Sequence, residues 1–148
     1  MLSEEIIEQL TETLQSRVLA VIGHPAGAIA IDEQRDLANG DLVTSVAAQV
    51  AKSVKRDPRA AAEAVAHAFP LPQLVKSVTA EPNGNLTFRF RRGAFTFELW
   101  RRLGGDISDE HALERLTIDD KVDDETWRAV RRYDRSDADP RAIVALFR

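Results

Sequence analysis

Apolar side chains recur at helical spacing over the first 22 residues. The positions three or four apart are Leu2, Ile6, Ile7, Leu10, Leu14, Val18 and Val21. This spacing places them on one face and predicts an amphipathic helix over residues 3–22, with Ser3 at its N-cap. The segment Gly23-His24-Pro25-Ala26-Gly27 ends that helix, and the apolar run 28–31 predicts a short strand.

Two alanine-rich helices are predicted in the middle of the chain. Asp41 can cap the first, over residues 42–54, which places Val46 and Val50 on one face. Asp57 caps the second, which runs to Phe69 and begins with a proline at its first position, where the missing N–H costs nothing.

Period-two alternation then replaces the helical spacing. Residues 75–80 and 85–90 flank Asn83-Gly84, a strong signal for a β-hairpin. Residues 95–100 also alternate, so we expect a further strand there, forming a second hairpin in which Phe90 pairs with Phe95.

Gly104-Gly105 marks the boundary to a C-terminal segment in which three short helices are predicted. They cover residues 108–116, 124–133 after the cap Asp123-Asp124, and 140–147 after the cap Asp139. The predicted fold is therefore α+β: a small antiparallel sheet, as a hairpin or meander, with helices on one side and a short helical C-terminal extension. The predicted domains are residues 1–103 and residues 104–148.

Composition and charge narrow the class of protein. The 148 residues contain no cysteine, which excludes disulfides and thiolate catalysis, and no apolar run is long enough to span a membrane. The first residues are acidic and amphipathic, unlike a signal peptide, so we expect a soluble cytoplasmic protein without membrane contact. The net charge is -4, but residues 41–103 carry 10 basic and 5 acidic side chains between two acidic ends.

The order of motifs in residues 39–90 resembles the N-terminal additional domain of arginyl-tRNA synthetases. The resemblance rests on the helix start Gly40-Asp41, the turn Arg56-Asp57-Pro58-Arg59 and the hairpin around Asn83-Gly84. It implies a domain without chemistry of its own that binds the elbow of tRNA. In that family the counterpart of residues 93–103 is usually a helix, which conflicts with the strand that local alternation favours for 95–100.

The resemblance also implies a base-contacting site on the second strand of the hairpin. In the family an aromatic residue and an asparagine contact a D-loop base, and these positions fall on Asn85 and Thr87. Both can form hydrogen bonds, but a stacking platform worth ~1–3 kcal/mol per base is absent. The alternative is that Asn85 simply follows a turn.

Basic side chains of the middle segment are the candidates for phosphate contacts. They are Lys52, Lys55, Arg56, Arg59, Arg89, Arg91 and Arg92. If the turn of residues 52–59 lies near the hairpin, these residues form a phosphate-binding patch. The alternatives are an ordinary solvated face that pairs with Glu98, or an acidic tail that folds over the patch and masks it.

No catalytic constellation is present, so we expect neither an enzyme nor a cofactor. The three histidines lack metal-ligand spacing, and the aspartate cluster of residues 119–125 lacks the glycine and the spacing of an EF-hand. The expected function is a non-catalytic module that binds tRNA or another structured RNA. The alternative is a protein–protein interaction or adaptor module that has lost RNA binding and binds a protein partner or, as a homodimer, a second copy of itself.

Overall fold

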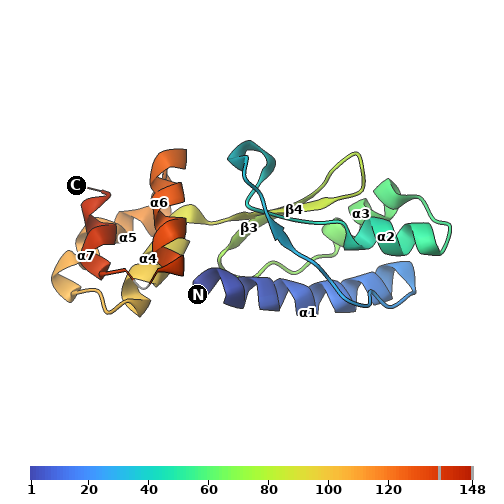
Figure 1. The fold of residues 1–148 in the computed structure, drawn as a ribbon, viewed down its shortest axis with the longest axis horizontal. Coiled ribbons are helices and arrows are strands. Elements are labelled where there is room, and N and C mark those ends of the chain that lie inside the picture. The colour runs from blue at the N-terminus through green and yellow to red at the C-terminus, as the bar shows by residue number, and fades with distance from the viewer. Residues whose placement is uncertain (137, 148) are drawn as a thin grey trace. The chain divides into compact units, whose positions relative to one another are not determined.

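The chain forms two compact units, Glu5–Phe90 and Met1–Glu4 with Arg91–Arg148 (Figure 1). The computed structural model describes residues 1–136 and 138–147, and for residues 112, 117 and 118 it describes the backbone alone. The units divide between Phe90 and Arg91. The predicted division into a domain of residues 1–103 and an extension of residues 104–148 stays a prediction.

The first unit contains a four-stranded antiparallel sheet in the order β1-β2-β4-β3. Its strands are β1 (Asp32–Glu33), β2 (Leu42–Thr44), β3 (Val75–Ala80) and β4 (Leu86–Phe90). Its helices are α1 (Leu2–Ile22) from Glu5 onward, the 3-10 turn η1 (Leu37–Asn39), α2 (Val46–Ser53) and α3 (Pro58–His67). The predicted α+β fold with a small antiparallel sheet is therefore confirmed.

Alternation along β4 divides the sheet into an apolar and a polar face. Leu86, Phe88 and Phe90 are buried, and the rings of Phe69 and Phe88 lie 5.5 Å apart. The core of this unit also includes fully buried side chains of the helices: Leu10, Leu14, Val18, Ala62 and Val65. Because successive side chains of a strand point to opposite faces, Thr87 and Arg89 lie on the other side of the sheet.

Local signals with nearby partners gave correct predictions. The helix expected over 3–22 is α1, although Ser3 lies inside this helix and is not its N-cap, and the hairpin around Asn83-Gly84 joins β3 to β4. Asp57 caps α3 as expected, since its carboxylate accepts a hydrogen bond of 3.1 Å from the Ala60 N–H.

The helix predicted over residues 42–54 with Asp41 as its cap was wrong in its first third. Residues 42–44 form β2, and α2 begins only at Val46. Asp41 is buried, donates its N–H to the Phe88 carbonyl at 2.8 Å and accepts the Phe90 N–H at 2.8 Å through its carboxylate. Pairing with β4 therefore overrides the local helical pattern.

The strand predicted over 28–31 was also wrong. That segment has no regular structure, and β1 lies just after it, where Asp32 pairs with Val43.

Residues 95–100 are helical, so the predicted strand and second hairpin were wrong, and the family expectation was correct. They belong to α4 (Arg92–Arg102). Both edges of β4 are already paired, with β2 and with β3, which leaves no edge for a further strand. Within α4 the buried side chains are Phe95, Thr96, Leu99 and Trp100, a helical spacing that overrides the alternation of the phenylalanines.

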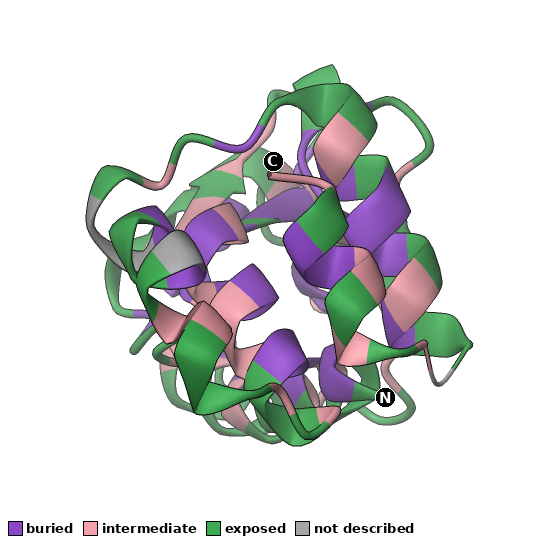
Figure 2. Cartoon of the chain, turned by 90° about the vertical axis from the view of Figure 1, so that its left-hand side faces the viewer, coloured by how far each residue is buried: buried purple, intermediate pink, exposed green. Residues whose placement is uncertain are grey.

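The second unit is helical. After α4 it contains the 3-10 turn η2 (Ile107–Asp109), α5 (Glu110–Asp119), α6 (Asp124–Arg135) and α7 (Pro140–Ala145). The three predicted helices are thus confirmed, although α5 begins two residues later than expected and ends three residues later. Figure 2 shows buried residues on the inward faces of these helices and exposed residues on their outer faces.

Caps and an aromatic core hold this unit together. Asp123 accepts the Thr126 N–H at 2.8 Å and Asp139 accepts the Arg141 N–H at 2.9 Å, as the sequence predicted. The rings of Phe95 and Trp127 meet edge to face, 5.1 Å apart.

The first residues of α1 belong to the second unit and are capped within it by a residue distant in the sequence. The buried carboxylate of Asp134 accepts hydrogen bonds from the N–H groups of Leu2 and Ser3, at 2.7 and 3.1 Å, and from the Ser3 hydroxyl at 2.6 Å. This carboxylate thus accepts hydrogen bonds from N–H groups at the helix start that have no partner within the helix.

In the part of the chain that the structure describes, every helix is too short or too polar to cross a membrane.

Candidate nucleic-acid interface

A polar pocket of about 330 Å³ opens in the first unit, beside the hairpin turn. It is lined by Gln34, Asn39, Val43, Glu81, Pro82, Asn83, Asn85 and Thr87. Both residues that the family resemblance singled out, Asn85 and Thr87, therefore line one pocket. Val43 and Thr87 pair directly across β2 and β4, so the sheet register fixes the floor of the pocket.

Beside β4, the groups of this pocket that can bind a ligand are mostly hydrogen-bond acceptors. The Thr87 hydroxyl donates to the Glu81 carboxylate at 3.0 Å or to the Thr79 carbonyl at 3.4 Å, which commits its only proton. Its lone pairs, the Glu81 carboxylate and the side-chain amide of Asn85 remain for a ligand. Amides and carboxylates recognise the edges of bases by hydrogen bonding, and the lining includes no aromatic ring for stacking.

The tip of the hairpin packs against α2 and α3, which places the pocket next to a basic turn. Gly84 has φ +88°, and a Cβ added there would lie 2.9 Å from the Ala48 Cβ and 3.1 Å from the Pro58 Cβ. Figure 1 shows the same approach of the β3–β4 loop to these helices. Since Arg59 follows Pro58 directly, the hairpin tip and the turn of residues 52–59 form one continuous surface.

The turn between α2 and α3 exposes four of the predicted basic residues: Lys52, Lys55, Arg56 and Arg59. Its backbone forms a Schellman motif, with the Arg56 N–H bonded to the Ala51 carbonyl at 2.8 Å and the Lys55 N–H to the Lys52 carbonyl at 3.1 Å. The left-handed position of this motif, usually a glycine, is Lys55 with φ +59°. A strained backbone thus holds a lysine at the apex of the turn.

Two arginines of the turn differ in their partners. Arg56 donates to the Ile22 carbonyl at 2.9 Å and to the Val21 carbonyl at 3.4 Å, so it closes the C-terminus of α1. Arg59 forms an ion pair of 3.1 Å with Glu63, in which both side chains are more than half exposed. Exposed pairs of this kind are worth little, so Arg59 can exchange its partner for a phosphate.

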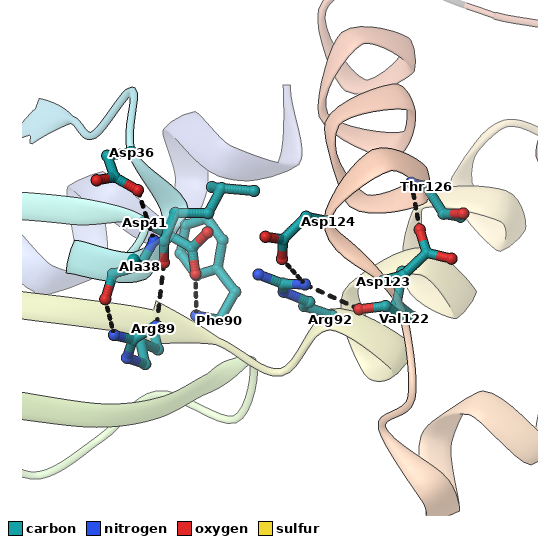
Figure 3. A network of polar contacts seen from close by, with 11 residues as sticks. Asp36, Ala38, Asp41, Arg89, Phe90, Arg92, Val122, Asp123, Asp124 and Thr126 are labelled. Atoms are coloured by element: carbon teal, nitrogen blue, oxygen red, sulfur yellow. Dashed lines mark hydrogen bonds and ion pairs between the residues drawn. The ribbon is translucent and has the colours of Figure 1, made fainter.

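Arg89 fastens the η1 turn to the polar face of the sheet. Its guanidinium donates to the Leu37 carbonyl at 3.2 Å and to the Ala38 carbonyl at 2.6 Å (Figure 3). Neutral carbonyls do not cancel its positive charge. Arg89, like Arg56, therefore adds to the positive potential of this unit while its position is fixed by backbone contacts.

Arg91 and Arg92 belong to the second unit, and only Arg91 is exposed. The Arg92 guanidinium donates to the Asp124 carboxylate at 2.9 Å and to the Val122 carbonyl at 2.8 Å (Figure 3). It also lies 5.7 Å from the centre of the Trp127 ring. The acidic segment 119–125 thus engages this arginine.

A neighbouring carboxylate of that segment is held in its charged form. The N–H and the hydroxyl of Thr126 donate to Asp123, and with the nearby Arg92 charge they lower the pKa of the Asp123 carboxyl below its usual value.

Sequence reasoning missed three polar residues of the pocket: Gln34, Asn39 and Glu81. The first two lie between the strand predicted over 28–31 and the helix predicted over 42–54. They reach the pocket because β1 pairs with β2 and β2 pairs with β4. With residues 42–44 assigned to a helix, no signal connected this segment to the hairpin.

Comparison with known proteins places the first unit in a family. Residues 4–90 match the arginyl tRNA synthetase N terminal domain. Among solved structures, the arginyl-tRNA synthetase of Thermus thermophilus is similar, with a TM-score of 0.53 and 26% sequence identity. The match covers 64% of this chain and 15% of the Thermus chain, so it includes only a small part of that enzyme. No match was found among the curated proteins.

Proposed function

This chain belongs to the family of arginyl-tRNA synthetase N-terminal domains, and from this premise we propose that it is a non-catalytic module that binds tRNA or another structured RNA. One observation carries the proposal: the basic turn and the polar pocket adjoin each other through the hairpin tip at Gly84. Both lie within residues 5–90, which is nearly the span of the family match. We expect the protein in the cytoplasm, where tRNA is found.

The two surfaces divide the work of recognition. Lys52, Lys55 and Arg59 supply contacts to phosphates, which give affinity without reading sequence. Asn85 and Thr87 offer hydrogen-bonding groups to the edge of an unstacked base in the pocket. Without an aromatic ring in the pocket, most of the affinity comes from the phosphates. The binding is therefore expected to depend strongly on salt.

Replacing Lys55 by glycine is expected to separate binding from stability. Glycine adopts φ +59° without strain, so the free energy of unfolding should rise by ~0.5–1 kcal/mol. Loss of one phosphate contact should weaken tRNA binding roughly 5- to 8-fold at 0.1 M salt. Urea denaturation and fluorescence anisotropy with labelled tRNA measure the two effects on the same protein.

Lys55→Ala is the matched control, because it removes the same charge and keeps the strained backbone. Its tRNA affinity should equal that of Lys55→Gly, while its stability should not rise. If Lys55→Gly bound tRNA as tightly as the unaltered protein, Lys55 would have no phosphate contact.

A protein–protein adaptor is the second candidate, and one contact favours it. The charge of Arg92 is paired with Asp124, so fewer cations are available for phosphates than the sequence suggests. The net charge of -4 also favours a protein partner over RNA. On this proposal the surface around Asn85 contacts a protein or a second copy of the chain, through binding that changes little with salt.

A further inference from the structure

The exposed face of α6 carries a row of arginines outside the family match. Arg128, Arg132 and Arg135 are exposed and follow each other at steps of four and three residues, which places them on one face of the helix. The opposite face buries Trp127, Val130 and other side chains of the core. We call Arg128, Arg132 and Arg135 the arginine stripe.

The helix dipole explains part of this arrangement. Basic residues are favourable near a helix C-terminus, but the effect is confined to the last turn. It accounts for Arg132 and Arg135, which belong to the last turn of α6, and not for Arg128, which lies in the second turn. Within the residues that the structure describes, neither Arg128 nor Arg132 takes part in an ion pair or a side-chain hydrogen bond.

The fourth arginine of α6 has a different, internal position. Arg131 is buried, and its guanidinium lies 5.9 Å from the centre of the Phe95 ring and 5.7 Å from that of Trp127. Packing against these rings gives it a structural role. Arg128 and Arg132 are exposed and make no such ring contact in the described part of the chain, so an anion can reach their guanidinium groups.

We propose that Arg128 and Arg132 of the arginine stripe bind phosphates of the RNA, so that residues 91–148 add RNA contacts of their own to those of the family domain. This inference rests on the proposed RNA-binding function. A guanidinium presents its N–H groups as a planar fork that matches two phosphate oxygens, and α6 uses arginine throughout and no lysine. A helix rises 1.5 Å per residue, so Arg128 and Arg132 lie about 6 Å apart along its axis and can contact separate phosphates.

The test is the salt dependence of tRNA binding by the double variant Arg128→Gln/Arg132→Gln. Two lost phosphate contacts should reduce the slope of log K against log salt by about 1.4 to 1.8, and should weaken binding roughly 30-fold at 0.1 M salt. Glutamine has nearly the helix propensity of arginine, so α6 should stay folded, and circular dichroism checks this. The control Arg115→Gln/Lys121→Gln removes the same charge from exposed positions outside α6 and should leave the slope unchanged.

Each other outcome overturns the inference in a recognisable way. An unchanged slope for the α6 variant, alongside weaker binding by variants of the turn at residues 52–59, would reject the stripe and leave the proposed function standing. Absence of tRNA binding by the unaltered protein would reject both. If the α6 variant bound tRNA normally but lost binding to polyglutamate, the stripe would serve an acidic polypeptide instead.

Discussion

Replacing Lys52, Lys55 and Arg59 together by glutamine is expected to weaken tRNA binding at least ~100-fold at 0.1 M salt. All three side chains are exposed, and none has a buried partner to lose. Each phosphate contact contributes about 0.7 to 0.9 to the salt slope, so the slope should fall by about 2.1 to 2.7. Fluorescence anisotropy with labelled tRNA over a series of salt concentrations measures both quantities.

A control of equal charge shows whether position matters. Arg17→Gln/Arg115→Gln/Lys121→Gln also removes three positive charges, but from residues outside the turn of residues 52–59, the pocket lining and the β3–β4 hairpin. It should alter affinity only slightly, through the general field of the protein. Equal losses in the two triple variants would show that net charge, rather than this surface, governs binding.

Replacing Gly93 by alanine is expected to destabilise the second unit by roughly 3 kcal/mol, the upper end of the usual cost of overpacking. An added Cβ would lie 1.8 Å from the Leu116 carbonyl oxygen and 2.6 Å from its carbon, where α4 packs against α5. Backbone atoms cannot move aside as a flexible side chain can, so the helices must separate. That separation would also disturb the hydrogen bond of 2.8 Å from the Gly93 N–H to Asp120. Denaturation followed by tryptophan fluorescence reports this change, because Trp100 and Trp127 both lie in this unit.

Gly104→Ala is the comparison for this effect. Gly104 has φ +86° and no atom within 4 Å of an added Cβ, so only backbone strain of ~1–2 kcal/mol is expected. If both variants lost the same stability, the close approach of α4 and α5 would not be the cause. The Gly93 variant should keep tRNA binding by the first unit, apart from the part contributed by the arginine stripe.

Structural features that depend on only a few neighbouring residues were predictable from the sequence. The cap at Asp57, the hairpin turn at Asn83-Gly84 and the caps at Asp123 and Asp139 each act within three residues. Their outcome is decided by local backbone geometry, so the residues themselves were sufficient evidence.

Features decided by distant pairing could not be predicted in this way. Asp41 fits a helix cap locally, yet its carboxylate bonds the N–H of Phe90, 49 residues later. Residues 95–100 alternate like a strand, but β2 and β3 already occupy both edges of β4.

The candidate site divides in the same way. The charges of the turn at residues 52–59 were predictable from composition. The hydrogen bonds from Arg56 and Arg89 to backbone carbonyls could not be predicted, because the carbonyls lie more than 30 residues away in the sequence.

Titration of the purified protein against bulk tRNA at about 0.1 M and about 0.3 M salt tests most directly whether the protein binds RNA through phosphate contacts. The proposed module should bind at the lower salt and lose affinity steeply at the higher one, since phosphate contacts release counterions. Absence of binding at low salt would contradict RNA binding and direct attention to a protein partner. Affinity that hardly changed with salt would show that an apolar surface, not the basic turn, makes the contact.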